Sequence, residues 1–391
     1  MRSLISRSAK LFTSKSTMNV TAARSMSQLT SIPRKQERVR DHGYDDYMEI
    51  QKKVRKVLKF QELILTQPNS MISIAHLDNL SRRIGFKQLE SGIFVLKFPH
   101  IERENEALQR QIPDAVTRIR KLLMMSKTGR IRLEHVCIAR KDFGLPDDFE
   151  YSVILKHPQF FRLFDADEMR NKYIEMVERD CTLGACEIER VREREYRERG
   201  VDAEDITFSF VVNFPPGFKI GKYYKIVMWK WQRLPYWSPY EDVSGYDLRS
   251  LEAQRRMEKR AVAMIHELLW LTVEKKMTLE RIAHFRMIMD SPKKLKEFML
   301  QHQGIFYIST MGNHGKLHTV FLREAHIKGE LVEPNELYLA RRNLAELVLV
   351  SLRKARPGGE LASYRRDGLD DHTRGWSGRD GRVGKLKRNR M

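Results

Sequence analysis

The chain has 391 residues, of which 41% are hydrophobic and 9% aromatic, so it can bury substantial cores and is not disordered throughout. Its 72 Lys and Arg outnumber its 51 Asp and Glu. The formal net charge of +21 favours polyanionic partners, unless it lies only in a leader and a tail on a neutral body. Three cysteines make no disulfide framework, and no apolar run approaches the roughly 20 residues that span a bilayer.

Residues 1–36 have the composition of an organellar transit peptide. They contain no Asp or Glu, but they carry seven Lys or Arg and eight serines between scattered apolar residues. The continuous apolar core of a secretory signal is absent from this segment. We expect import into mitochondria, with the chloroplast as the alternative destination and an ordinary basic terminus as the plain alternative.

Residues 37–350 are predicted to form one domain that contains a helical motif three times, near 47–101, 113–214 and 258–325. Apolar residues at three- and four-residue steps predict a helix from 47 to 65 and three helices in the middle copy, over 115–125, 133–143 and 147–155. Gly144-Leu-Pro146 separates the last two, because glycine suits a helix end and proline a first turn. The same pattern predicts helices over 71–84, 87–96, 261–273, 279–289 and 293–301. Such units usually stack into an extended binding surface, although a duplicated scaffold without a shared function is the alternative.

Short apolar and aromatic segments follow the third helix of the two later copies. Residues 160–164 and 305–308 are predicted strands, and a turn-rich spacer joins the second of these to 318–322 in a hairpin. Residues 187–199 are predicted to form an exposed helix. Residues 206–214 alternate in polarity, so we expect them to form a strand that pairs with 160–164. The predicted fold class is mainly α with small β hairpins, arranged as tandem helical, winged-helix-like repeats.

The segment 214–242 is the most aromatic part of the chain and is interleaved with Lys and Arg. A turn followed by a strand is predicted here, with Trp229 and Trp231 on one face and Lys230 on the other. Exposed aromatic rings next to cations can stack on unpaired bases while the cations hold phosphates. The alternative is that the tryptophans pack in the core.

No catalytic constellation is found. His266-Glu267 lacks the second histidine of a zinc protease, Gly217 to Lys222 has the wrong spacing for a phosphate loop, and the Cys181–Cys186 pair has no second ligand pair nearby. We therefore expect no enzyme activity, no metal, no cofactor and no small-molecule substrate.

Nucleic-acid binding has better support, because basic residues recur at equivalent positions of the repeats and could neutralise successive phosphates. The candidate RNA-binding residues are Arg82, Arg83, Arg130, Arg132, Arg140, Lys141, Lys222, Lys225, Trp229, Lys230, Trp231, Arg233, Arg281, Arg286, Lys293, Lys294 and Lys296. Any one of these cations taken alone is better explained as a solvated surface charge.

Several segments between about 38 and 349 resemble, in the same order, those of the plant organelle RNA recognition domain family. They include 122–130 (LLMMSKTGR), 143–149 (FGLPDDF), 156–161 (KHPQFF), 214–218 (FPPGF), 231–236 (WQRLPY) and 238–242 (SPYED). The resemblance implies a non-catalytic RNA-binding protein of chloroplasts or mitochondria that promotes splicing of group II introns. Lys87 and Gln303 stand where the family pattern would favour proline, which weakens local capping.

The sequence thus predicts a mitochondrial protein that binds intron RNA, single-stranded or structured, with other splicing factors as further partners and no membrane contact. Residues 351–391 are predicted to be a basic, Gly-rich disordered tail. The alternative function is a helical-repeat adaptor that binds organellar proteins and touches RNA only through this tail.

Overall fold

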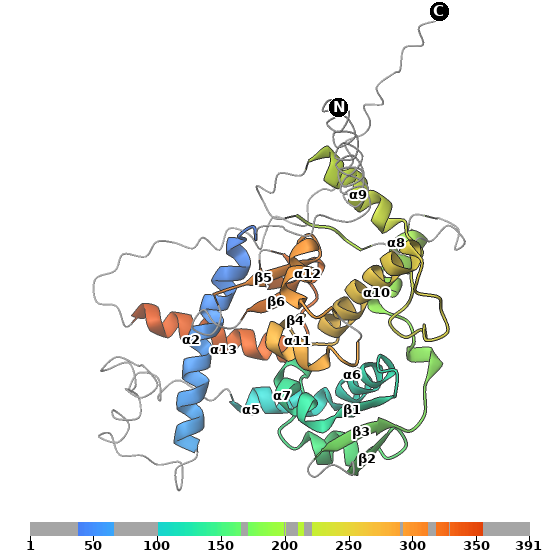
Figure 1. The fold of residues 1–391 in the computed structure, drawn as a ribbon. Helices are drawn as coiled ribbons and strands as arrows, with labels where there is room; N and C mark the ends of the chain where they lie inside the picture. The colour runs from blue at the N-terminus through green and yellow to red at the C-terminus, as the bar shows by residue number, and fades with distance from the viewer. Residues whose placement is uncertain are drawn as a thin grey trace, which may run out of the picture.

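The computed structural model of the chain describes residues 38–65, 101–165, 171–198, 200, 210–214, 221–289, 292–311, 318–327 and 329–354 (Figure 1). Within these ranges the protein is mainly helical, with small antiparallel sheets. The predicted leader 1–36, the predicted helices 71–84 and 87–96, and most of the predicted tail lie outside the described residues. No described helix is long and apolar enough to cross a membrane.

The middle unit alternates helices with the strands of one small sheet. It consists of α6 (Ile112–Met124), β1 (Arg130–Arg132), α7 (Leu133–Phe143), the π-helix η2 (Glu150–Leu155), β2 (Phe161–Asp165) and β3 (Lys172–Met176). The sheet order is β1-β3-β2, and both pairings are antiparallel. Gly144 ends α7 with a left-handed φ of 66°, as the Gly-Leu-Pro sequence predicted. The helix predictions over 115–125 and 133–143 and the strand prediction over 160–164 are confirmed.

The third unit repeats this order of elements. It consists of α10 (Leu251–Trp270), β4 (Lys276–Thr278), α11 (Leu279–Phe285), α12 (Leu295–Gln301), β5 (Phe306–Ser309) and β6 (Thr319–Leu322), with the antiparallel sheet order β4-β6-β5. The predicted hairpin between 305–308 and 318–322 is confirmed. The middle and third units therefore share both chain order and sheet order.

The strand prediction for 206–214 is wrong within the described part of that segment. β2 pairs instead with β3, which the sequence analysis missed. Residues 210–214 form an extended segment outside the sheets, and the Asn213 amide donates a hydrogen bond to the Gly304 carbonyl at 2.8 Å. A Cβ atom at Gly304 would lie 2.3 Å from a Val212 methyl carbon, so glycine allows this close approach.

The strand prediction within 214–242 is also wrong, because Lys222–Gln232 form the helix α9. Tyr224, Val227, Met228 and Trp231 are buried, and their spacing is that of one helical face. The aromatic and β-branched residues had favoured a strand by composition, but burying this face satisfies their packing equally well. Trp229 and Trp231 consequently point in different directions.

A buried ion pair joins the middle and third units. Lys121 on α6 lies 3.0 Å from the Glu267 carboxylate on α10, and the Tyr240 hydroxyl donates to the same oxygen at 2.7 Å. Arg281 on α11 pairs with Asp142 on α7 at 2.7 Å. One continuous hydrophobic core contains residues from both units, so the two units form a single packed body.

The remaining elements surround the two units. They are α2 (His42–Leu65), α5 (Ile101–Arg110), α8 (Glu187–Glu198), α13 (Glu336–Lys354), the two-stranded pair β7 (His326–Ile327) and β8 (Glu330–Leu331), and the short 3-10 turns η3 (Cys181–Leu183) and η6 (Arg323–Ala325). α13 packs on both α2 and α5, and the three lie on one side of the molecule in Figure 1. Its Arg341 links Glu104, Glu274 and the Lys141 carbonyl. α13 also continues to Lys354, beyond the predicted start of the tail at 351.

Candidate nucleic-acid interface

The helix α9 divides its side chains between core and solvent. On the outer side, Tyr223, Ile226 and Trp229 are exposed, and Trp229 keeps 54% of its surface in solvent. On the inner side, Trp231 is 5% exposed and packs against Phe210, with ring centroids 5.7 Å apart. Trp229 can therefore meet a ligand without rearrangement, whereas Trp231 belongs to the core, which was the alternative that the sequence left open.

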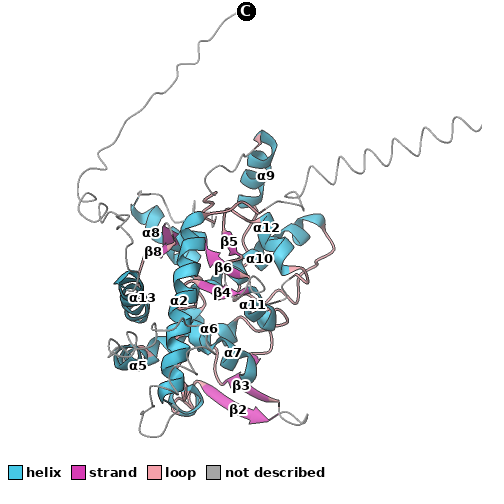
Figure 2. Ribbon diagram, turned by 90° about the vertical axis from the view of Figure 1, so that its left-hand side faces the viewer, coloured by secondary structure: helices cyan, strands magenta, loops and turns pink. Residues whose placement is uncertain are grey.

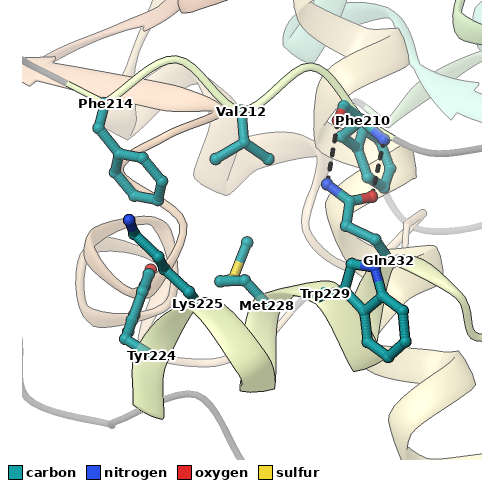
Figure 3. A pocket seen from close by; sticks show the side chains of 8 residues that line it. All are labelled: Phe210, Val212, Phe214, Tyr224, Lys225, Met228, Trp229 and Gln232. Atoms are coloured by element: carbon teal, nitrogen blue, oxygen red, sulfur yellow. Dashed lines mark hydrogen bonds between the residues drawn. The ribbon is translucent and has the colours of Figure 1, made fainter. Parts of the chain in front are cut away.

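An open pocket of about 380 Å³ lies between α9 and the extended segment 210–214 (Figure 3). Its lining is largely apolar and consists of Phe210, Val212, Phe214, Tyr224, Lys225, Met228, Trp229 and Gln232. The Gln232 side chain fixes one wall, since it accepts a hydrogen bond from the Phe210 amide at 2.9 Å and donates one to the Phe210 carbonyl at 3.0 Å. A flat, partly apolar group such as a nucleobase fits this kind of surface.

Three cations border the exposed aromatic side of α9. The Arg233 guanidinium lies 3.6 Å from the centroid of the Trp229 ring, which is cation–π contact. Lys225 lines the pocket, and Lys230 is exposed on the same helix. A base stacked near Trp229 would thus have positive charge within reach for its phosphates.

Buried groups hold α9 in place. Lys259 donates hydrogen bonds to the carbonyls of Gln232 and Leu234 at 2.7 and 2.8 Å, and these carbonyls lie at the C-terminal end of the helix. Desolvation lowers the pKa of Lys259 to about 8. Burial raises the pKa of Tyr224 to about 12, so its phenol stays neutral and donates to the Gln301 carbonyl at 3.3 Å.

Arg130 and Arg132 lie elsewhere, on β1 of the middle unit. Arg130 forms an ion pair with Glu175 at 2.6 Å, and Arg132 donates a hydrogen bond to the Tyr173 hydroxyl at 3.2 Å. Hydrogen bonds from Arg162 and Arg130 hold the pKa of Glu175 below its ordinary value. Arg162 was not among the predicted RNA-binding residues, although its place between Phe161 and Phe164 in a predicted strand was a signal for an outward-facing cation.

The other candidate cations do not join these two groups. Arg281 is engaged in the ion pair with Asp142, Arg140 pairs with the exposed Asp147 at 2.9 Å, and Arg286 is half-buried. The exposed residues among the rest are Lys141, Lys293, Lys294 and Lys296. Lys222 begins α9, whereas Arg82 and Arg83 lie outside the described residues.

The part of the chain that the structure describes contains no group of three or more His, Cys, Asp or Glu side chains arranged to hold a metal ion. Cys186 is buried, which raises the pKa of its thiol well above the ordinary value, while Cys137 and Cys181 are exposed. The candidate interface therefore consists of aromatic rings, guanidinium groups and ammonium groups. These groups bind anions and flat rings.

The chain is basic and mainly helical and presents exposed aromatic rings beside cations, a surface chemistry that is typical of nucleic-acid-binding proteins. The family model of the plant organelle RNA recognition domain matches residues 39–102 and 101–353. The chain therefore belongs to the plant organelle RNA recognition domain family.

Comparison with individual proteins agrees with this assignment. The chain is 67% identical over 380 residues to Protein ROOT PRIMORDIUM DEFECTIVE 1 of Arabidopsis thaliana, covering 90% of this chain and 93% of that protein. It is 32% identical over 348 residues to the chloroplastic Protein WHAT'S THIS FACTOR 1 of Zea mays, covering 80% and 67%. It is 26% identical over 338 residues to the mitochondrial Protein WHAT'S THIS FACTOR 9 of Arabidopsis thaliana, covering 79% and 84%. No solved structure matches the chain.

Proposed function

We propose that this protein binds intron RNA in mitochondria and promotes group II intron splicing without catalysing a reaction itself. The RNA would perform the chemistry, and the protein would stabilise the folded RNA by holding particular segments. The chloroplast is the alternative compartment, because relatives of the chain are chloroplastic as well as mitochondrial by name. The leader 1–36 would direct import.

The arrangement around Trp229 carries the proposal. This ring is more than half exposed, is contacted by Arg233, and borders an apolar pocket that also presents Lys225. An exposed tryptophan ring gains contact by stacking on an unpaired base, and the neighbouring cations can then pair with the phosphates. Family membership supports the same reading.

The domain organisation in this proposal follows the predicted one. The middle and third units would be winged-helix-like repeats, since each has the order helix, strand, two helices and two strands around a three-stranded sheet. Residues 47–101 would hold a first, related unit. Stacked units of this kind would extend the binding surface along an RNA.

The experiment recovers the RNA bound to a tagged full-length protein in organelles and sequences it. The purified protein is then titrated with the recovered intron and with random RNA of equal length at about 0.15 M ionic strength. We expect tighter binding to the recovered intron. Equal affinity for both RNAs would contradict the proposal, and the recovered transcripts would identify the compartment.

A second candidate function is a helical-repeat adaptor that contacts RNA only through its basic tail. The exposed apolar side chains Tyr223 and Ile226 on α9 are the observation that favours it, because such residues also form protein interfaces. Deleting 355–391 leaves α13 complete and distinguishes the two functions. The adaptor loses RNA binding on this deletion, whereas our proposal expects the preference for the intron to persist.

A further inference from the structure

The outer face of the middle sheet carries a second group of cations and aromatic rings. β-Pairing aligns Arg130 with Glu175 and Glu175 with Arg162, and it aligns Arg132 with Tyr173 and Tyr173 with Phe164. We call these six residues the cationic sheet face. The alternate row, Ile131, Ile174 and Leu163, points to the core, where the two isoleucines are buried.

The charges on this face do not cancel. Arg130 and Arg162 share the single carboxylate of Glu175, at 2.6 and 2.5 Å, and Arg132 adds a third guanidinium. The side chains of Arg130 and Arg162 remain 48% and 68% exposed. Fixed guanidinium groups that stay accessible can pair with phosphate oxygens in a bidentate manner.

The aromatic part of the face forms a stacked pair. Phe164 and Tyr173 have ring centroids 5.5 Å apart and an interplanar angle of 18°. The Arg130 guanidinium lies 4.8 Å from the centroid of Phe164, and that of Arg132 lies 5.9 Å from the centroid of Tyr173. Both the rings and the guanidinium planes are surfaces on which unpaired bases stack.

The third unit has an equivalent face with a different chemistry. There one row across the sheet consists of Lys276, Phe321 and Tyr307. The next row consists of Thr278, Thr319 and Ser309. The helix α2 covers these rows: Tyr44 stacks on Tyr307 at 4.7 Å and contacts Phe321 edge-on at 5.1 Å, and Asp45 accepts a hydrogen bond from Ser309 at 2.6 Å. Figure 2 shows the upper half of α2 beside the β4–β6 sheet, whereas β2 and β3 lie at the bottom of the view.

This difference restricts what can occupy the middle face. A helix that packed an apolar face here, as α2 packs Tyr44 on the third unit, would remove the exposed guanidinium groups of Arg130 and Arg162 from water against the single carboxylate of Glu175. Burying the excess charge costs several kcal/mol. An anionic ligand with flat rings removes that cost and also uses the aromatic pair. Paired RNA hides its base faces inside the helix, so it would leave Phe164 and Tyr173 unused.

We infer that the cationic sheet face is a second RNA-binding surface, separate from α9, that takes an unpaired segment with its bases on Phe164 and Tyr173 and its phosphates on the arginines. This inference rests on the proposed function and adds the place and the form of the RNA. We expect little sequence specificity at this face, because all four bases have a ring face that can stack on an aromatic side chain.

The test uses the full-length protein with an unstructured oligouridine of about 12 nucleotides and an RNA hairpin of equal length. Replacing both rings (Phe164→Ala with Tyr173→Ala) removes two stacking surfaces, so oligouridine binding should weaken roughly 30-fold or more and hairpin binding much less. Arg162→Ala should weaken binding and reduce its salt dependence. The matched control is Arg197→Ala on α8, since Arg197 is also highly exposed and paired with one carboxylate, Glu193.

Photo-crosslinking of the unaltered protein to oligouridine guards against misfolding of the double variant. We expect crosslinked peptides that contain β2 or β3. If the protein binds RNA, but crosslinks avoid these strands and Arg162→Ala matches the Arg197→Ala control, the inference is wrong while the proposed function stands. Equal losses for hairpin and oligouridine would also overturn it. If the unaltered protein binds no RNA, the proposed function itself fails.

Discussion

The two neighbouring tryptophans of α9 allow surface binding to be separated from folding. Trp229 is 54% exposed, and the Arg233 guanidinium lies 3.6 Å from the centroid of its ring. Trp229→Ala should therefore change the free energy of unfolding by about 1 kcal/mol or less, the value of an exposed cation–π pair. Loss of one stacked base costs about 1–3 kcal/mol, so the affinity for single-stranded intron RNA should fall roughly 5- to 150-fold.

Trp231→Ala, two residues further along α9, is the matched control. Trp231 is 5% exposed, and its ring lies 5.7 Å from Phe210 and 5.1 Å from His302. Truncating a buried tryptophan costs about 3–5 kcal/mol of stability. The variant should unfold at a much lower urea concentration. The protein that remains folded should keep its affinity for RNA, because Trp229 is still present on α9.

The assays are fluorescence anisotropy with a labelled intron fragment at about 0.15 M ionic strength and urea unfolding followed by circular dichroism. The reasoning is refuted if Trp229→Ala binds RNA as tightly as the unaltered protein. It is equally refuted if the affinity and the stability of Trp229→Ala fall in parallel, since that result would make Trp229 a structural residue like Trp231.

Three further perturbations test the packing that supports the interface. Glu267→Gln leaves buried Lys121 without its carboxylate partner, so urea unfolding should show a loss of about 3–5 kcal/mol; a loss below about 1 kcal/mol would contradict the structural role of the pair. Burial lowers the pKa of His326 from 6.5 to about 4, so the unfolded chain takes up its proton first as pH falls. Stability is then present above pH 6.5 and lost as pH falls towards 4, and from pH 7 to pH 5 the protein should lose about 2 kcal/mol more than His326→Asn. Gly144→Ala puts a Cβ 2.6 Å from the nearest side-chain atom at a φ of +66°, and thermal melting should show a cost of about 1–3 kcal/mol; Gly245→Ala, which meets nothing within 4 Å, should be nearly silent.

Most helices of the two units could be predicted because their signals are local. The Gly-Leu-Pro sequence after Phe143 ends α7 where expected, and apolar spacing marks α6 and α10. α9 was missed because its aromatic content favours strands, although Tyr224, Val227, Met228 and Trp231 already have helical spacing in the sequence. β3 was missed because Lys172 and Glu175 make it look like a surface loop until its partners are known.

The interfaces depend even more on contacts that are distant in sequence. Charge at repeated positions was enough to select Arg130 and Arg132. Sheet pairing brings Arg162 onto the same face as Tyr173, whose strand β3 was not predicted from the sequence. Burial of Trp231 likewise depends on Phe210 and His302, which come from separate segments.

The helix α2 has a consequence for how the chain is made. Tyr307 donates a hydrogen bond to Asp45 across 262 positions, and Arg323 pairs with Asp41 across 282. A ribosome therefore releases α2 long before the sheet that receives it, and contacts of such long range form late in folding. Until then, Tyr44 and Met48 lack the sheet residues on which they pack, so α2 exposes apolar side chains while the rest of the chain is being made.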